Sequence, residues 1–174
     1  QFLRDKGFKI EKKKSQMKPN LIEFIKVSND QETGKGTKNS ATLYNRNNKG
    51  KLEELKIEIS FGVGRASSIP WIAFTGFNQT VKNGIYPVFL YYKELKTLIL
   101  AYGVSETNIP HFNWTLPDSK ITIKEYFKNK LSQSSVKYGT SYVYKTYEIE
   151  SLPSEEILTK DLSNLIKEYK LLFS

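Results

Sequence analysis

The sequence has no cysteine, a single histidine and a single methionine among its 174 residues, and it has no long apolar run. Without cysteine, disulfide-stapled scaffolds, thiolate zinc sites and cysteine nucleophiles are excluded. No stretch approaches the roughly 18–20 apolar residues of a membrane-spanning helix, and the first residues lack the apolar core of a signal peptide. These absences favour a cytoplasmic protein without a membrane partner.

Residues with catalytic chemistry are also scarce. The single histidine, His111, follows a proline in a polar loop, which is typical of a surface residue. Glu94-Leu95-Lys96 has the Glu-x-Lys spacing of some nucleases but no acidic partner upstream in the same segment. Gly34-Lys35-Gly36-Thr37 is not a nucleotide-binding P-loop, which needs a further glycine five residues earlier and a position between a strand and a helix. We therefore expect no catalytic residues, no metal and no cofactor, and we expect that the chain is not an enzyme.

The net charge is +9, from 27 basic and 18 acidic residues. A basic balance of this size favours a polyanionic partner such as nucleic acid. The charge is uneven: residues 1–50 hold 12 basic and 5 acidic side chains, net +7, which leaves 15 and 13, net +2, for residues 51–174. A nucleic-acid footprint on the larger part must therefore be local.

Hydrophobic periodicity predicts a sheet followed by two helices. Apolar residues at 57, 59 and 61 alternate with polar ones, as in a half-buried strand, and apolar segments follow at 69–74, 85–92 and 97–103. Asn83-Gly84 predicts a turn, and residues 141–149 a further strand. The spacing from Thr122 to Glu125 predicts a capping box that starts a helix. A C-terminal amphipathic helix is predicted from Leu158, Leu162, Leu165, Ile166 and Tyr169. The predicted fold class is α+β, with a curved, mostly antiparallel sheet flanked by helices.

The remaining regions are polar. Residues 1–18 read as a basic leader, either solvated or in contact with phosphates. A short amphipathic helix is expected after Pro19, with Leu21, Phe24 and Ile25 on its apolar side. Residues 28–50 read as a long polar loop within a single domain that spans residues 19–174.

The loop of small residues from Gly62 to Ser68 links two expected strands and carries one cation, Arg65. Its glycines let the backbone approach DNA closely. Most of the eleven Tyr, ten Phe and two Trp must fill the core. The few aromatic residues near the loops remain candidates for a binding site.

Four motifs carry a family resemblance: FGxG at 61–64, SIPWxAF at 68–74, NGIYPVxLYYK at 83–93 and LAYGxSxTN at 100–108. In this order and spacing they resemble the N-terminal DNA-binding domain of McrB proteins, the GTP-dependent subunits of modification-directed restriction systems. The resemblance covers roughly residues 52–174. It implies a DNA-binding specificity module that flips modified cytosine out of duplex DNA. It also implies that the chain is a fragment, with a C-terminal GTPase domain and a nuclease subunit as partners in the full system.

The resemblance also implies roles for individual residues. The implied base pocket consists of Trp71, Tyr86, Leu90 and Tyr138. The implied DNA-contacting loop residues are Gly62, Val63, Gly64, Arg65, Ser67 and Ser68, and the implied phosphate contacts are Lys82 and Lys137. Val63 departs from the pattern, because an aromatic wedge is expected between the two glycines. Stacking an aromatic ring on a base contributes about 1–3 kcal/mol, so either Val63 acts as an apolar plug or Arg65 takes over the wedge.

Two alternative functions remain open. The same fold can read another modified base or a particular sequence, a possibility that Val63 motivates. A protein-interaction or assembly domain is the second alternative, in which all the aromatic residues belong to the core. An enzyme that acts on the flipped base lacks residues to perform the chemistry.

Overall fold

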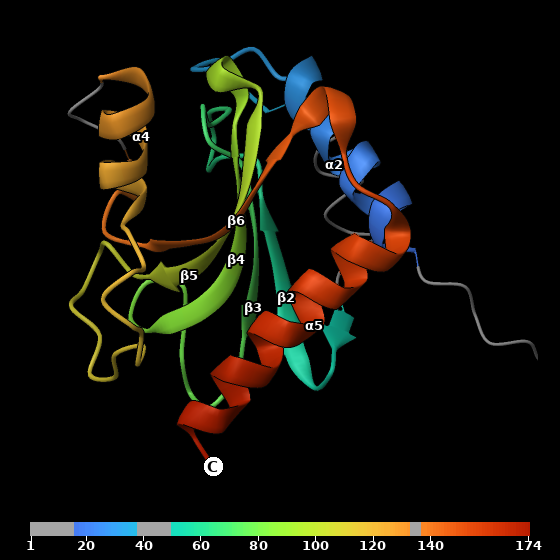
Figure 1. Cartoon of the computed structure of the whole chain (residues 1–174). Helices are drawn as coiled ribbons and strands as arrows, with labels where there is room; N and C mark the ends of the chain where they lie inside the picture. Colours follow the sequence, from blue (N-terminus) through green and yellow to red (C-terminus); the bar gives the residue numbers. More distant parts are fainter. Residues whose placement is uncertain (1–15, 38–49, 133–136) are drawn as a thin grey trace, which may run out of the picture.

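One antiparallel sheet of six strands, ordered β1 to β6 as in the sequence, forms the centre of the molecule (Figure 1). The computed structural model describes residues 16–37, 50–132 and 137–174, so most of the basic leader lies outside the described residues. The strands are β1 (Gly50–Leu52), β2 (Leu55–Ser60), β3 (Trp71–Thr75), β4 (Ile85–Tyr92), β5 (Thr97–Val104) and β6 (Tyr142–Glu148). This arrangement confirms the expected α+β class with a curved antiparallel sheet.

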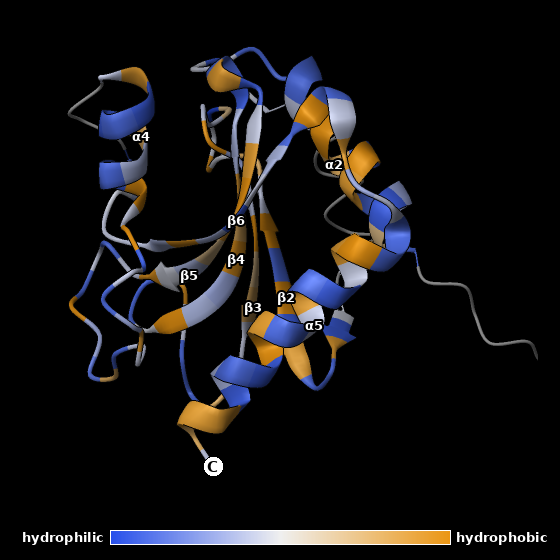
Figure 2. Cartoon of the chain, viewed as in Figure 1, coloured by the Kyte–Doolittle hydropathy of each residue, from blue (hydrophilic) through white to orange (hydrophobic). Residues whose placement is uncertain are grey.

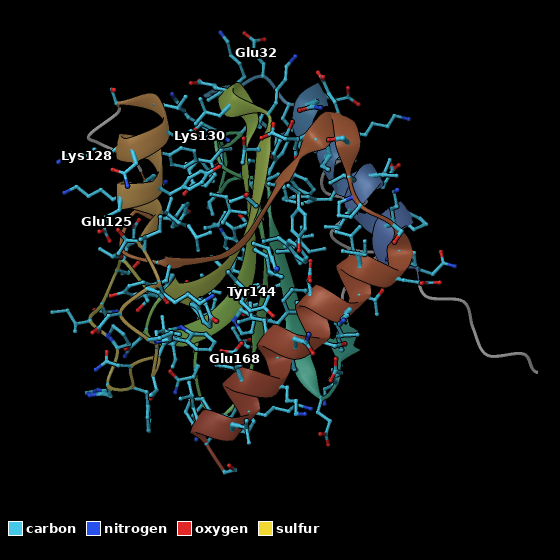
Figure 3. The ribbon with its side chains drawn as sticks, in the orientation of Figure 1. Glu32, Glu125, Lys128, Lys130, Tyr144 and Glu168 are labelled. Carbon is cyan, nitrogen blue, oxygen red and sulfur yellow. The ribbon has the colours of Figure 1, made fainter. Side chains whose placement is uncertain are left out.

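Helices cover both faces of the sheet (Figure 1). The helices are α2 (Met17–Asp30), α4 (Ile123–Leu131) and α5 (Glu155–Leu172), with short helices η1 (Lys93–Leu95) and η2 (Ile149–Ser151). The Tyr91 ring packs edge-on against Phe24 of α2, whereas the Tyr92 ring packs against Phe127 of α4. Successive residues of a strand point to opposite faces, so α2 and α4 lie on opposite sides of β4. Glu168 accepts a hydrogen bond from Tyr102 and places α5 on the α2 side, across the sheet from Lys128 of α4 (Figure 3).

The core sits around β4, in which all eight residues are buried. A continuous apolar run of this kind suits a strand covered on both faces, and hydrophobic residues run along the central strands in Figure 2. The five apolar residues predicted for the C-terminal helix are all buried along α5. The expected strand at 85–92 and the C-terminal helix are therefore confirmed.

Helix α2 is longer than the sequence predicted. It begins at Met17, before Pro19, because the Glu155 carboxylate of α5 accepts hydrogen bonds from the Met17 and Lys18 backbone N–H groups at 3.1 and 2.7 Å. Pro19 is tolerated in the first turn, where its missing N–H would have no partner within the helix. The helix continues to Asp30, so the expectation of a polar loop from residue 28 was wrong at its start. Residues 38–49 of that loop lie outside the described residues.

The capping box predicted at Thr122 is present at the start of α4. The Thr122 side chain accepts a hydrogen bond from the Glu125 N–H, and the Glu125 carboxylate accepts one from the Thr122 N–H. Helix α4 buries Ile123 and Phe127, whereas Leu131 at its end is 43% exposed. After four residues outside the described part of the chain, a turn at 137–140 leads into β6.

Candidate nucleic-acid interface

Side chains from β3, β4 and the turn before β6 surround one small cavity on the α4 side of the sheet. Trp71, Tyr86, Leu90 and Tyr138, the four predicted pocket residues, all line it. Its other lining residues are Val81, Val88 and Ser141, which sequence reasoning missed. Val88 could have been found from strand alternation, because it lies between Tyr86 and Leu90 on the same face. Val81 and Ser141 come from loops, where no periodicity in the sequence indicates which way a side chain points.

The register of the sheet brings the cavity residues together. Trp71 is the first residue of β3 and stands opposite Leu90 of β4. Tyr86 stands opposite Gly103 of β5, where a Cβ atom would lie 2.4 Å from the Tyr86 carbonyl oxygen and 2.9 Å from a Val88 methyl carbon. Glycine at position 103 therefore leaves space for Tyr86 and Val88, which both line the cavity.

The cavity is nearly filled by the side chains that line it. Its volume, about 10 Å³, has room for the centre of a single water molecule. Tyr86 is 5% exposed and Leu90 2% exposed, so these two side chains form the deep wall. Trp71 and Tyr138 are only half-buried and form the outer wall. A nucleobase is far larger than one water molecule, so the outer wall must move before a base can be bound.

Two hydrogen bonds hold the turn that carries Tyr138. Tyr92 donates its hydroxyl to the Lys137 carbonyl at 2.8 Å, and the Tyr138 N–H donates to the Glu106 carboxylate at 2.8 Å. Tyr138 itself has a left-handed backbone, with φ of 62°. Burial raises the pKa of the Tyr138 phenol and the nearby Glu106 charge raises it further, while a hydrogen bond from the Trp71 indole opposes both effects. The phenol is therefore neutral at pH 7, and it lines the outer wall together with Trp71.

The deep wall is also uncharged. Tyr86 donates its hydroxyl to the Val81 carbonyl at 3.2 Å. Burial, together with the charge of Glu106, raises the pKa of Tyr86 well above its usual value. The cavity thus offers neutral rings and aliphatic side chains, which suit the faces of an uncharged heterocycle.

The glycine-containing loop from Gly62 to Ser68 joins β2 to the strand that begins at Trp71. Gly62 has φ of 115°, and a Cβ atom there would lie 1.9 Å from the Arg65 carbonyl oxygen, so only glycine fits. Ser67 closes the loop, because its N–H donates to the Phe61 carbonyl at 2.8 Å and its Oγ accepts from the Ile69 N–H at 3.0 Å. Ser68, half-buried, follows it toward Trp71.

The tip of the same loop points into solvent. Val63 is 97% exposed, and Gly64 and Arg65 are exposed beside it. An apolar side chain held this far from the core gains nothing from burial within the domain. Its position at the exposed tip of the loop suits insertion into another surface.

The two predicted phosphate contacts flank the cavity. Lys82 is exposed and follows Val81 at the Tyr86 end, where its carbonyl accepts a hydrogen bond from the Asn108 N–H at 3.1 Å. Lys137 is also exposed, and its Nζ atom lies 5.4 Å from the centre of the Tyr138 ring. The structure therefore brings together the predicted pocket, the loop that leads into it and both lysines. Their roles in binding remain predictions.

The described residues contain neither a metal site nor a membrane-spanning helix. Among them, no group of three or more His, Asp or Glu side chains is arranged to hold a metal ion. No helix in the described ranges is both long enough and apolar enough to cross a membrane.

Fold and cavity together define a small α+β domain that presents a small, aromatic-lined cavity beside an exposed, glycine-containing loop. Residues 25–174 match the family described as the MrcB-like N-terminal domain, and the chain belongs to this family. Over 159 residues it is 40% identical to the Type IV methyl-directed restriction enzyme EcoKMcrB subunit of Escherichia coli strain K12. That alignment covers 91% of this chain and 33% of the relative, so the chain spans about a third of the relative's length.

Proposed function

We propose that this chain is a DNA-binding specificity module that recognises modified cytosine in duplex DNA by flipping the base into the aromatic cavity. Its family and a relative described as a methyl-directed restriction enzyme subunit support a role in modification-dependent restriction. The module itself is not an enzyme. In the full system, GTP hydrolysis belongs to a C-terminal domain and DNA cleavage to a nuclease subunit.

The convergence of four side chains around one cavity is the observation that carries this proposal. Two of them, Tyr86 and Leu90, form a fixed floor within the sheet, and the other two, Trp71 and Tyr138, form a half-exposed wall. A base that displaces the Trp71–Tyr138 contact would lie between two aromatic rings. Enzymes and readers that extrude a base hold it in this way.

The loop and the lysines account for the other parts of the mechanism. Val63 at the loop tip fills the space that the extruded base leaves, and Arg65 binds in the groove or to a phosphate. Lys82 and Lys137 neutralise phosphates on the flanks, which fixes the position of the module without reading sequence. Because valine cannot stack as an aromatic ring does, the flipped state loses part of the roughly 1–3 kcal/mol that such stacking supplies.

The chemistry of the cavity limits its selectivity. Burying one methyl group contributes about 0.8 kcal/mol, which corresponds to about a fourfold difference in affinity. A single domain is therefore expected to bind with modest affinity and strong salt dependence. Several domains on one oligomer would add avidity.

The test is a direct binding measurement with the 174-residue chain. Matched duplexes that differ only in one 5-methylcytosine are titrated at two salt concentrations, and we expect tighter binding of the methylated duplex. An abasic site opposite guanine serves as a control, because it removes the base that the cavity would hold. Equal affinity for methylated and unmethylated duplexes would remove the claim that the domain reads this modification.

A panel of modified bases tests the alternative that Val63 motivates. Duplexes with 5-hydroxymethylcytosine, N4-methylcytosine or N6-methyladenine are compared with the 5-methylcytosine duplex. Preference for one of the other three would keep base reading and change the ligand. Failure to bind any duplex would favour the alternative of a protein-interaction domain.

A further inference from the structure

Residues 31–37, here called the turn segment, pair with the glycine-containing loop. Gly34 donates its N–H to the Ala66 carbonyl at 2.9 Å, and Ala66 donates its N–H to the Lys35 carbonyl at 2.7 Å. Gly36 and Arg65 form an isolated antiparallel bridge. The polar region around Gly34-Lys35-Gly36 therefore forms a second backbone strand beside the loop that leads into the cavity.

A tight turn sets the direction of this segment. Lys35 donates its N–H to the Glu32 carbonyl at 3.0 Å, and Gly34 has φ of 82°. This hydrogen bond with a left-handed third residue is the pattern of a type II turn, which favours glycine at that position. Glu32 and Lys35 are both exposed, so the turn presents one charge of each sign to solvent, and Glu32 lies at the far end of the molecule in Figure 3.

The turn segment is anchored to the sheet at its start. Tyr91 of β4 donates its hydroxyl to the Asn29 side chain at 2.6 Å, and the Lys93 ammonium donates to the Gln31 carbonyl at 2.9 Å. Gln31 is 3% exposed. The segment thus connects the rigid end of β4 to the loop, and it restrains a loop that would otherwise be attached only at its two ends.

We propose that the turn segment is a second DNA-contacting element, in which Lys35 binds a backbone phosphate beside Arg65 while the paired backbone holds the loop in its binding conformation. This inference rests on the proposed function, since it assumes that the loop meets DNA. The chemistry is that of phosphodiester binding by a lysine ammonium, which is independent of base sequence and of modification.

Charge substitutions of opposite sign test the contact. Lys35→Gln removes a phosphate contact, so raising salt from about 50 to about 200 mM should weaken wild-type binding about 3.5-fold more than it weakens the variant. The loss should be equal for methylated and unmethylated duplexes. Glu32→Gln removes a carboxylate that faces the same phosphates, so it should tighten binding. Lys167→Gln removes an equal charge from an exposed position of α5, on the sheet face opposite the cavity, and should change neither affinity nor salt dependence.

Substitutions at two glycines test, without changing charge, whether the turn segment holds the loop in its binding conformation. Gly34→Ala places a side chain at a left-handed position, which strains the turn although the space around it is open. A less ordered loop should weaken binding about two- to tenfold. Gly36→Ala is the matched control, because its Cβ atom would make only an ordinary contact, 3.9 Å from the Gly64 carbonyl oxygen.

The outcomes separate this inference from the proposed function. If the wild-type chain binds methylated DNA but Lys35→Gln and Glu32→Gln behave like Lys167→Gln, the turn segment does not face DNA and the inference is overturned. If those two substitutions shift binding in opposite directions, the contact is supported. If the wild-type chain binds no duplex, both the function and the inference fail.

Discussion

The two tryptophans of the chain lie on opposite faces of the sheet, which allows Trp71 to report on base insertion directly. Trp114 packs against Tyr102 and Tyr169 on the α5 side, with ring centres 4.9 and 5.4 Å away, and donates to the Gly103 carbonyl at 2.9 Å. Trp114→Phe keeps an aromatic ring there and loses one hydrogen bond, at a cost of about 0.5–1.5 kcal/mol. Trp71 is then the only tryptophan.

In this background, a base that stacks on Trp71 should quench its fluorescence. Titration with methylated duplex should lower the emission until binding saturates, and unmethylated duplex should lower it less at full occupancy. Trp71→Leu removes stacking worth about 1–3 kcal/mol, so its dissociation constant for methylated duplex should rise about 5- to 150-fold. Trp71→Phe, which keeps a ring, should lose less.

Folding must be checked separately, because Trp71 also contacts Tyr138 across the outer wall. Circular dichroism and thermal unfolding of each variant provide this control, and half-burial of Trp71 limits the expected loss of stability. The reasoning is refuted if Trp71 emission stays constant while methylated DNA binds to saturation. It is refuted equally if folded Trp71→Leu binds methylated duplex as tightly as Trp114→Phe does.

Three further predictions concern the loop, the cavity floor and α4. Gly64→Ala should cost about 1 kcal/mol in thermal unfolding from backbone strain alone, and Gly62→Ala should cost more, because its Cβ atom would collide with the backbone. Gly103→Ala should destabilise the fold by about 1–3 kcal/mol and weaken methylated-duplex binding, since Tyr86 must shift into the cavity. Capping hydrogen bonds from Thr122 lower the pKa of Glu125 below its ordinary value. The ionised Glu125 carboxylate therefore stabilises the folded state above that ordinary pKa, and this contribution is lost as the pH falls through the lower folded-state pKa. Unfolding at graded pH should show this loss in the wild type and not in Glu125→Gln.

Apolar runs and capping spacing, which depend on residues close together in the sequence, predicted the central strand and the start of one helix. The apolar run at 85–92 matches β4 at both ends, and the spacing at Thr122 predicted the capping box of α4. The start of α2 could not be predicted from nearby residues, because the acceptor for its first backbone N–H groups is the carboxylate of Glu155, which is far away in the sequence. The turn segment was missed for the same reason, since its order depends on Ala66 and Arg65 and not on its own composition.

In the candidate site, too, features set by nearby residues were predicted and features set by distant residues were not. Residues of one strand, such as Tyr86 and Leu90, share a face by alternation, and the motif that contains them was identified by resemblance. Glu106 escaped notice, although it accepts the hydrogen bond that holds Tyr138 in place, because nothing in an exposed loop sequence indicates which backbone group a carboxylate will meet. Composition and periodicity predicted where rings would lie, whereas the idea that they surround a base came from the resemblance alone.

The small free volume of the cavity limits how the domain can discriminate between bases. Opening the cavity moves the Trp71 and Tyr138 side chains apart, which costs their mutual packing, and stacking on the inserted base returns about 1–3 kcal/mol. Both terms are nearly the same for every base, because every base has an aromatic face. Only the methyl contact, worth about 0.8 kcal/mol or fourfold, and the cost of extruding the base distinguish one cytosine from another. Two linked domains that bind two modified sites on one DNA would raise the methyl factor to about sixteenfold, so under the proposed function assembly would add more selectivity than a tighter pocket.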